Sequence, residues 1–154
     1  MKEKNTSAIG HSLETYYSIC KEYEKLWAEF AKACKLSPAE CGILFTLREG
    51  VDTQAEICEE LSMPKQTANS AIKKLEAKEL IRLLPSEKDQ RTKKICFTKD
   101  GELFAEKNID AINAAEERIW AAMTAEEKEF LIDISRKYNR LFKQELEEFL
   151  NHEH

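Results

Sequence analysis

The stretch SMPKQTANSAIKKLEAKELIRLL, residues 62–84, decides the fold because it combines a turn, a helix and the start of a strand. Ser62, Met63 and Pro64 predict a tight turn, and a short helix is expected over residues 65–78. The apolar residues of this helix recur at helical spacing and predict one buried face, made of Ala68, Ala71, Ile72 and Leu75. The other face is polar and basic, as a helix that binds a ligand on its outer side requires.

Two further helices are expected before this turn. Ser37 and Glu40 are spaced as a capping box, and Pro38 suits the first position of a helix that Gly50 then breaks. Thr53 and Glu56 form a second such pair, which opens a short helix through residue 61. Two short helices joined by a tight turn are typical of helix-turn-helix.

The periodicity changes after the helix expected over residues 65–78. Residues 80–84 and 94–98 predict two short strands around a polar loop, which is a β-hairpin or wing. Thr98 is expected to cap a helix that runs to about residue 122, although Gly101 weakens its first turn. Thr124 and Glu127 predict one more capping box, before a last helix with apolar residues at helical spacing from Phe130 to Phe149.

The first helix carries a seam of the kind found in coiled coils. Apolar residues alternate at spacings of four and three over nearly four heptads: Ile9, Leu13, Tyr16, Cys20, Tyr23, Trp27, Phe30 and Cys34. With the apolar stripe of the last helix, this seam predicts a homodimer; the alternative is a helix packed wholly on its own domain. We therefore expect a mainly α single domain, with a winged helix-turn-helix over residues 37–98 and helical dimerisation parts over residues 7–36 and 99–150.

The charge distribution points to nucleic acid although the whole chain is acidic. The formal net charge is −5. Residues 64–94 hold nine Lys or Arg and four Asp or Glu. The rest of the chain holds 15 Lys or Arg and 25 Asp or Glu. A phosphate-facing surface needs such a local basic patch rather than a basic average.

The outer face of the helix over residues 65–78 offers groups that suit the major groove. Gln66 and Asn69 could read adenine, and Lys65 could reach guanine. The remaining candidates suit contacts with bases or phosphates: Thr67, Ser70, Lys73 and Lys74. The alternative is an ordinary solvated helix face, but no acidic residue occurs from position 64 to position 75.

The hairpin loop adds further candidates for DNA contact. Arg91 at the tip could enter the narrow, electronegative minor groove, and Asp89 could orient it by a charge-assisted hydrogen bond. Lys88 and Lys93 add positive charge beside it. The alternative is an ordinary charged hairpin.

These segments resemble the MarR family of bacterial winged-helix regulators. The family pattern ends its helix-turn-helix in Leu-Glu-x-x-Gly-Leu-Ile/Val, continues with Asp-x-Arg in the wing and leads to Leu-Thr-x-x-Gly. The resemblance is carried by residues 61–81, 89–91 and 95–101, in which Glu79 stands in place of Gly and Phe97 in place of Leu. The resemblance implies a homodimer with recognition helices in successive major grooves and wings in the flanking minor grooves. Glu79 then occupies a helix-ending position that favours Gly, at a cost of about 1 kcal/mol.

The resemblance also implies release of DNA when a small molecule or an oxidant reaches the junction of the two parts. Aromatic residues of the first helix could line an effector pocket there, or form the dimer core instead: Tyr16, Tyr17, Tyr23 and Trp27. Cys20 lies on the seam, where a structural thiol is the expected role and redox sensing the alternative. His11, His152 and His154 lie at the two chain ends, so no metal site is expected, and neither a cofactor nor a catalytic motif is indicated.

The leading hypothesis is therefore a cytoplasmic transcription regulator without a membrane segment. We expect it to bind double-stranded DNA at a pseudo-palindromic operator as a homodimer, most simply as a ligand- or stress-responsive repressor. One alternative is a winged-helix module that binds another protein. The other is a small-molecule-binding protein without DNA activity.

Overall fold

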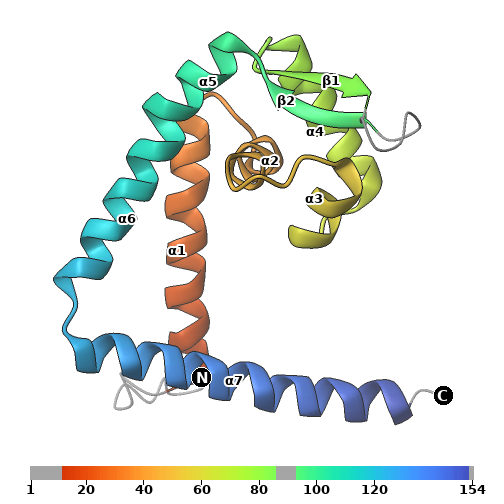
Figure 1. The fold of residues 1–154 in the computed structure, drawn as a ribbon. Helices are drawn as coiled ribbons and strands as arrows, with labels where there is room; N and C mark the ends of the chain where they lie inside the picture. Colours follow the sequence, from red (N-terminus) through yellow and green to blue (C-terminus); the bar gives the residue numbers. More distant parts are fainter. Residues whose placement is uncertain (1–11, 86–92, 153–154) are drawn as a thin grey trace, which may run out of the picture. The chain divides into compact units, whose positions relative to one another are not determined.

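The computed structural model describes residues 12–85 and 93–152 (Figure 1). Its elements run in the order α1 (Leu13–Ala33), α2 (Pro38–Arg48), α3 (Gln54–Glu60), α4 (Lys65–Ala77), β1 (Ile81–Pro85), β2 (Lys93–Phe97), α5 (Lys99–Ala105), the π-helix η1 (Glu106–Asp110), α6 (Ala111–Ala122) and α7 (Ala125–His152). The expected fold class, mainly helical with a β-hairpin wing, is confirmed. The chain divides into two compact units, one ending at Ile109 and the other beginning at Asp110.

The core of the first unit surrounds α2. Six large side chains are almost fully buried and come from α2, α3, α4, β2 and η1: Ile43, Leu44, Ile57, Leu75, Ile95 and Ile109. Each such burial contributes about 1.5–3 kcal/mol relative to an exposed side chain. The predicted inner face of α4 is confirmed, since Ala68, Ala71, Ile72 and Leu75 are its buried residues. This face fixes α4 on α2 and α3 and leaves its polar side exposed.

Capping side chains define where the helices begin. At α2, the Ser37 hydroxyl accepts from the backbone N–H of Glu40 at 3.2 Å, and the Glu40 carboxylate accepts from the backbone N–H of Ser37 at 2.7 Å. Thr124 and Glu127 form the same reciprocal pair before α7. The predicted box at Thr53 forms only in part, because the Glu56 carboxylate accepts from the Thr53 hydroxyl at 2.5 Å.

Three helices of the first unit end in the same left-handed turn. The residue after each C-cap has a positive φ, at 57° for Lys35, 47° for Ser62 and 58° for Glu79. At the end of α4, the N–H of Leu80 donates to the carbonyl of Leu75, and the N–H of Glu79 donates to that of Glu76. This is the Schellman pattern, in which glycine is the favoured left-handed residue. The predicted positive φ of Glu79 is thus confirmed.

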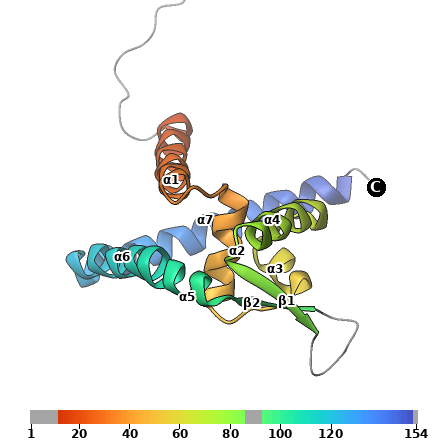
Figure 2. The ribbon, with the colours of Figure 1, turned by 90° about the horizontal axis from the view of Figure 1, so that it is seen from above.

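The hairpin has a third, shorter partner that the sequence analysis missed. Strands β1 and β2 pair antiparallel, with Ile81 opposite Phe97 and Leu83 opposite Ile95. On the other side of β2, Thr53 bridges to Lys94, and the N–H of Ile95 donates to the carbonyl of Asp52 at 2.7 Å. This isolated bridge attaches the segment before α3 to the two-stranded sheet, and the hairpin lies beside α3 and α4, as Figures 1 and 2 show.

The second unit consists of α6 and α7, and neither helix contains a buried residue. Large hydrophobic side chains of α7 are exposed, among them Phe130 at 70% and Phe142 at 61%. The seam of α1 is also exposed at Leu13 and Tyr23, while Ile9 lies outside the described residues. Across residues 12–85 and 93–152, no helix has both the length and the apolar character needed to cross a membrane.

The helix expected to run unbroken from residue 99 to about 122 is interrupted by η1. This five-residue π-helical stretch displaces the regular hydrogen-bond ladder. The Asn108 side chain compensates in part, because its Nδ2 donates to the carbonyl oxygen of Phe104 at 2.9 Å. The amide thus supplies a hydrogen bond where the helix changes its winding.

Gly101 also supports the fold by permitting a close backbone contact, a role that the sequence analysis missed. A Cβ at this position would lie 1.8 Å from the carbonyl oxygen of Leu80. The first turn of α5 is held there because the Thr98 N–H donates to that same oxygen at 3.1 Å, and the Thr98 hydroxyl accepts from the Gly101 N–H at 2.9 Å. Only a residue without a side chain permits this approach.

We expect Gly101→Ala to lower the free energy of unfolding by about 1–3 kcal/mol, because the added methyl group forces the backbone of α5 away from Leu80. Urea denaturation followed by circular dichroism measures this change. Gly42→Ala is the matched control, since its Cβ would meet only the flexible end of the Leu61 side chain at 3.3 Å. Equal stability of the two variants would contradict the role assigned to the close approach.

Candidate nucleic-acid interface

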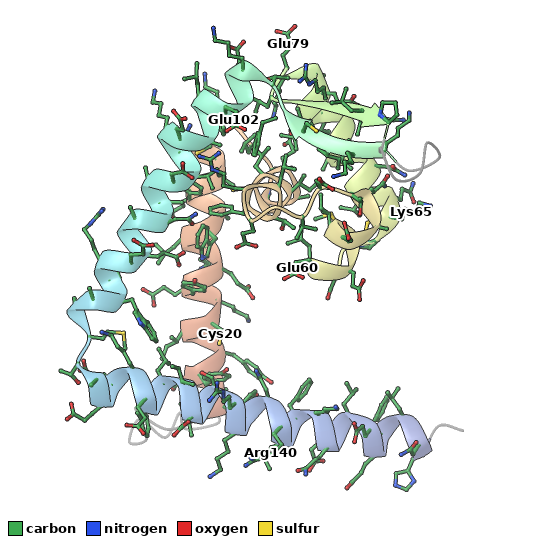
Figure 3. All side chains as sticks on the ribbon, viewed as in Figure 1. Cys20, Glu60, Lys65, Glu79, Glu102 and Arg140 are labelled. Atoms are coloured by element: carbon green, nitrogen blue, oxygen red, sulfur yellow. The ribbon has the colours of Figure 1, made fainter. Side chains whose placement is uncertain are left out.

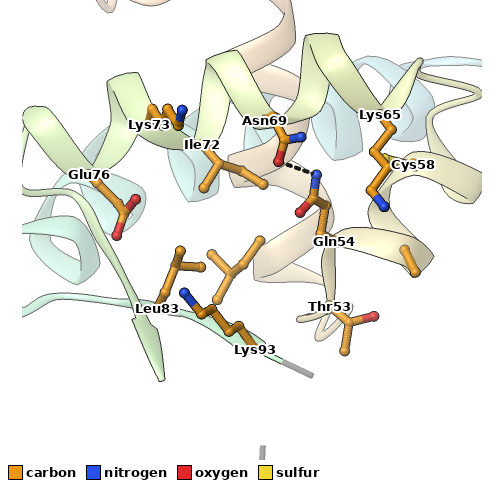
Figure 4. A pocket seen from close by; sticks show the side chains of 12 residues that line it. Thr53, Gln54, Cys58, Lys65, Asn69, Ile72, Lys73, Glu76, Leu83 and Lys93 are labelled. Carbon is orange, nitrogen blue, oxygen red and sulfur yellow. Dashed lines mark hydrogen bonds between the residues drawn. The ribbon is translucent and has the colours of Figure 1, made fainter. Parts of the chain in front are cut away.

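The polar side of α4 presents two rows of side chains. Lys65, Asn69 and Lys73 border a groove of about 620 Å³ between α3, α4 and the hairpin (Figure 4). Gln66, Thr67, Ser70 and Lys74 border a second groove of about 410 Å³ beside Ser37 at the start of α2. All seven predicted α4 residues are exposed. We call them together the reading face.

The hairpin contributes one described residue to the first groove. Lys93, at the start of β2, lines it together with Leu83 and Ile95. Lys88, Asp89 and Arg91 lie outside the described residues. Among the described members of the predicted site, Lys65, Lys73 and Lys93 therefore border the first groove, and Lys74 borders the second.

The electrostatics of the reading face favour an anionic partner. No acidic residue occurs on α4 before Glu76, which lines the first groove and is partly buried. Pro64 at the N-cap offers no side-chain hydrogen bond to the first turn. The positive end of the helix dipole is therefore not offset by a capping oxygen from this residue. Figure 3 labels Lys65 and Glu79 near the two ends of α4.

Two contacts of the site were missed by the sequence analysis. Gln54, the first residue of α3, donates from Nε2 to Oδ1 of Asn69 at 2.6 Å. The Lys94 Nζ lies 2.7 Å from the Asp52 Oδ2 and ties β2 to the segment before α3. Both pairs join residues that are far apart in sequence and brought together by the docking of α3 against α4 and β2. No local spacing signals such a contact.

An ion pair fixes the other end of α4. The Lys78 Nζ donates to the Glu40 Oε1 at 2.6 Å and to the carbonyl oxygen of Lys35 at 2.9 Å. The Glu40 side chain is 3% exposed. Burial alone would raise the pKa of Glu40, but hydrogen bonds from Lys78 and Ser37, together with the positive charge of Lys78, outweigh it and hold this pKa below its ordinary value. The end of α4 is thereby tied to the junction of α1 and α2.

The predicted aromatic pocket exists only in part. Tyr23 and Trp27 line a groove of about 500 Å³ between α1 and α2, together with Phe45 and Cys41. The Trp27 and Phe45 rings meet edge to face, with centroids 5.4 Å apart. Tyr16 and Tyr17 lie earlier on α1, are exposed and contact each other, with centroids 5.9 Å apart. Two of the four predicted residues are thus brought together.

The thiol in this groove is held in its neutral form. Burial, with a smaller contribution from Cys34, raises the pKa of Cys41 to about 11. Burial also raises the pKa of Cys34, whose sulfur lies 3.7 Å from the Asn108 Oδ1. A neutral thiol is a poor nucleophile, so Cys41 contributes to the groove as a small apolar group.

Comparison with known proteins identifies the helix-turn-helix. Residues 35–92 match the sequence profile of the MarR family. This segment is a MarR-family winged helix. A solved MarR family regulator from Neisseria meningitidis is similar in structure at a TM-score of 0.71 and 19% identity, and the match covers 90% of this chain and 99% of that one. No curated protein matches the chain in sequence.

Two further MarR structures extend this likeness. A MarR/EmrR family transcriptional regulator from an Acinetobacter species matches at a TM-score of 0.67 and 23% identity, covering 85% of this chain and 96% of that one. BpsR of Bordetella bronchiseptica is a protein whose DNA binding is regulated by 6-hydroxynicotinic acid. It matches at a TM-score of 0.62 and 18% identity, and the match covers 86% of this chain and 98% of that one. The chain thus has the fold of MarR-family transcription regulators over most of its length, helices outside the winged helix included.

We expect Lys78→Met to lower the free energy of unfolding at pH 7 by about 1–3 kcal/mol, because it leaves the buried Glu40 carboxylate without its cation. Glu40 has a depressed pKa in the folded protein, so the pair stabilises fully above the ordinary carboxyl pKa and is lost as the pH falls through the depressed one. The difference between the two proteins should therefore shrink in acid. Urea denaturation at several pH values measures it.

Lys74→Met is the matched control, since Lys74 is an exposed lysine of the same helix. It should leave stability nearly unchanged at every pH. A stability difference for Lys78→Met that stays constant down to acid pH would show that the charge of Glu40 is not what the lysine stabilises.

Proposed function

We propose that this protein binds double-stranded DNA as a homodimer and regulates transcription. The observation that carries the proposal is the reading face: seven polar or basic side chains exposed on α4, bordered by Lys93, within a chain of net charge −5. The MarR-family match over residues 35–92 supports the same proposal.

The dimensions and chemistry of α4 suit the major groove. A helix of 13 residues is about 20 Å long, and the groove admits one helix. Gln66 and Asn69 carry amides that can read base edges, and Lys65 can reach guanine. Thr67, Ser70, Lys73 and Lys74 are placed to contact bases or phosphates beside them. The hairpin, with Arg91, Asp89 and Lys88, is proposed to reach the adjacent minor groove.

A second copy of the chain is the proposed partner of the exposed apolar helices. Neither α6 nor α7 buries a residue within one chain, although α7 exposes Phe130, Leu141, Phe142 and Phe149. Exposed apolar surface on this scale marks an interaction site. A homodimer of the kind that the MarR resemblance implies would cover it and would present two reading faces to two half-sites about 10 bp apart.

A small apolar or aromatic molecule is the proposed effector. Its candidate site is the groove lined by Tyr23, Trp27 and Phe45, which is mostly apolar and about 500 Å³ in volume. BpsR, a protein of the same fold, is regulated in its DNA binding by such a compound. We propose that ligand binding weakens DNA binding by a repressor.

The second candidate function is docking of another protein on the winged helix. The acidic balance of the chain favours it, since most of the surface would repel DNA. The two functions differ in their response to salt. Displacement of counterions makes DNA binding steeply salt dependent, whereas docking on an apolar surface depends on salt only weakly.

We expect tight binding to duplex DNA from the upstream region of the protein's own gene, weakening by about 10³-fold or more between 50 and 200 mM salt if six or more phosphates are contacted. Arg91→Ala should weaken binding while the circular dichroism spectrum and thermal unfolding stay unchanged. Fluorescence anisotropy against this duplex and a scrambled one measures both effects.

Lys99→Ala is the control for lost charge, because Lys99 begins α5, outside the reading face and the hairpin loop. It should bind like the unmodified protein. Absence of binding to either duplex at low salt would exclude the DNA-binding proposal and favour protein docking. Unchanged affinity of Arg91→Ala would contradict only the role of the wing.

We expect Leu141→Asp to convert the dimer into monomers at micromolar concentration, because it places a charge in the proposed apolar interface of α7. Leu141 is 48% exposed in one chain. Sedimentation equilibrium measures the mass, and Arg140→Asp, the neighbouring exposed residue labelled in Figure 3, is the control. A monomeric unmodified protein, or a Leu141→Asp variant that remains fully dimeric, would contradict the assigned interface.

A further inference from the structure

The hydrogen bond between Gln54 and Asn69 joins the two helices of the helix-turn-helix at the reading face. Gln54 Nε2 donates to Asn69 Oδ1 at 2.6 Å, and both side chains border the 620 Å³ groove (Figure 4). Asn69 is exposed and Gln54 is partly buried. Water competes for such a bond, so it contributes little to folding. Its consequence is geometric, because in the structure it turns the oxygen end of the Asn69 amide toward Gln54.

The backbone around Gln54 is fixed on both sides. The preceding residue, Thr53, bridges to Lys94 of β2, and its hydroxyl accepts from the Glu56 N–H to begin α3. The carbonyl of Asp52 accepts from Ile95. Gln54 therefore starts its helix from a segment that is attached to β2, and its side chain is directed toward α4 by this support.

An asparagine amide has one end that accepts hydrogen bonds and one that donates them. Because the oxygen end of Asn69 is turned to Gln54, its NH₂ end is left to donate. Lys65 and Lys73, four residues before and after Asn69 on the same helix, border the same groove and are also donors only. The row along α4 thus offers three donors, which complements a base edge rich in acceptors, such as purine N7, guanine O6 or thymine O4.

We propose that Gln54 is a specificity-determining residue, which holds the Asn69 amide with its NH₂ end outward so that it reads acceptor atoms of a base. This inference rests on the proposed DNA binding. Gln54 acts through Asn69, so it is a positioning residue rather than a base contact. It also refines the expectation for Asn69, whose Oδ1 is already engaged before any adenine is met.

The test uses the full-length protein and measures relative affinity for a set of duplexes that carry each base in turn at every operator position. Asn69→Ala identifies the position that Asn69 reads, where discrimination falls by about tenfold. Gln54→Met keeps the length of the side chain but cannot donate, so the amide of Asn69 is free to turn and discrimination at that position weakens.

Gln54→Glu should reverse the preference. An ionised carboxylate only accepts hydrogen bonds, so it engages the NH₂ end of Asn69 and turns the oxygen outward. At the same position, the preference should shift from acceptor groups toward the amino groups of cytosine or adenine. A change in the type of base preferred, as opposed to affinity alone, is a readout that loss of stability does not produce.

Ala55→Glu is the matched control, because Ala55 borders the same groove and gains the same charge next to Gln54. It should lower affinity for all duplexes alike without changing the preferred base. In an Asn69→Ala background, Gln54→Glu should no longer alter the preference, as coupled residues require in a double-mutant cycle.

The outcomes separate this inference from the proposed function. No binding of the unmodified protein to any duplex overturns DNA binding itself. Normal binding with unchanged base preferences in Gln54→Met and Gln54→Glu overturns the role of Gln54 and leaves DNA binding intact. Unchanged preferences in Asn69→Ala also overturn the inference, because Asn69 then reads no base.

Discussion

The backbone of Glu79 and Leu80 joins α4, the hairpin and α5 at one place. The Leu80 carbonyl accepts from the Thr98 N–H, the Glu79 carbonyl accepts from the Thr98 hydroxyl, and Gly101 leaves room for the Leu80 oxygen. One pair of peptide groups thus sets where α4 ends, where β1 begins and where α5 departs. Because the same contact serves three elements, the relation of α4 to the hairpin does not depend on side-chain packing alone.

The other attachments of α4 are of different chemical kinds. Its apolar face is buried against α2 and α3. At its C-terminal end, the Lys78 ammonium group donates to the Glu40 carboxylate and to the carbonyl oxygen of Lys35. Apolar burial gives affinity between helices without direction, whereas hydrogen bonds and the ion pair fix rotation and register. The reading face is therefore exposed in a defined orientation.

Much of the fold follows from local signals in the sequence. The spacing of Ala68, Ala71, Ile72 and Leu75 predicts the buried face of α4, and Ser37 with Glu40 predicts the start of α2, since both depend on neighbours within one helix. The pairing of Thr53 with Lys94 and of Gln54 with Asn69 depends on tertiary docking and has no such signal. The close contact of Gly101 with Leu80 was missed for the same reason, because it too depends on tertiary docking. The π-helical turn at Glu106–Asp110 likewise leaves no periodicity to read.

The three left-handed helix ends at Lys35, Ser62 and Glu79 bear on how the sequence has been selected. Each holds a residue with a Cβ where glycine is the easier choice, at about 1 kcal/mol apiece. The free energy of unfolding of domains of this size is only about 5–15 kcal/mol, so three such positions lower it by a noticeable fraction. Selection has evidently tolerated this deficit, as expected for proteins kept just above the stability they need. The backbone therefore retains room for stabilising substitutions at these three helix ends.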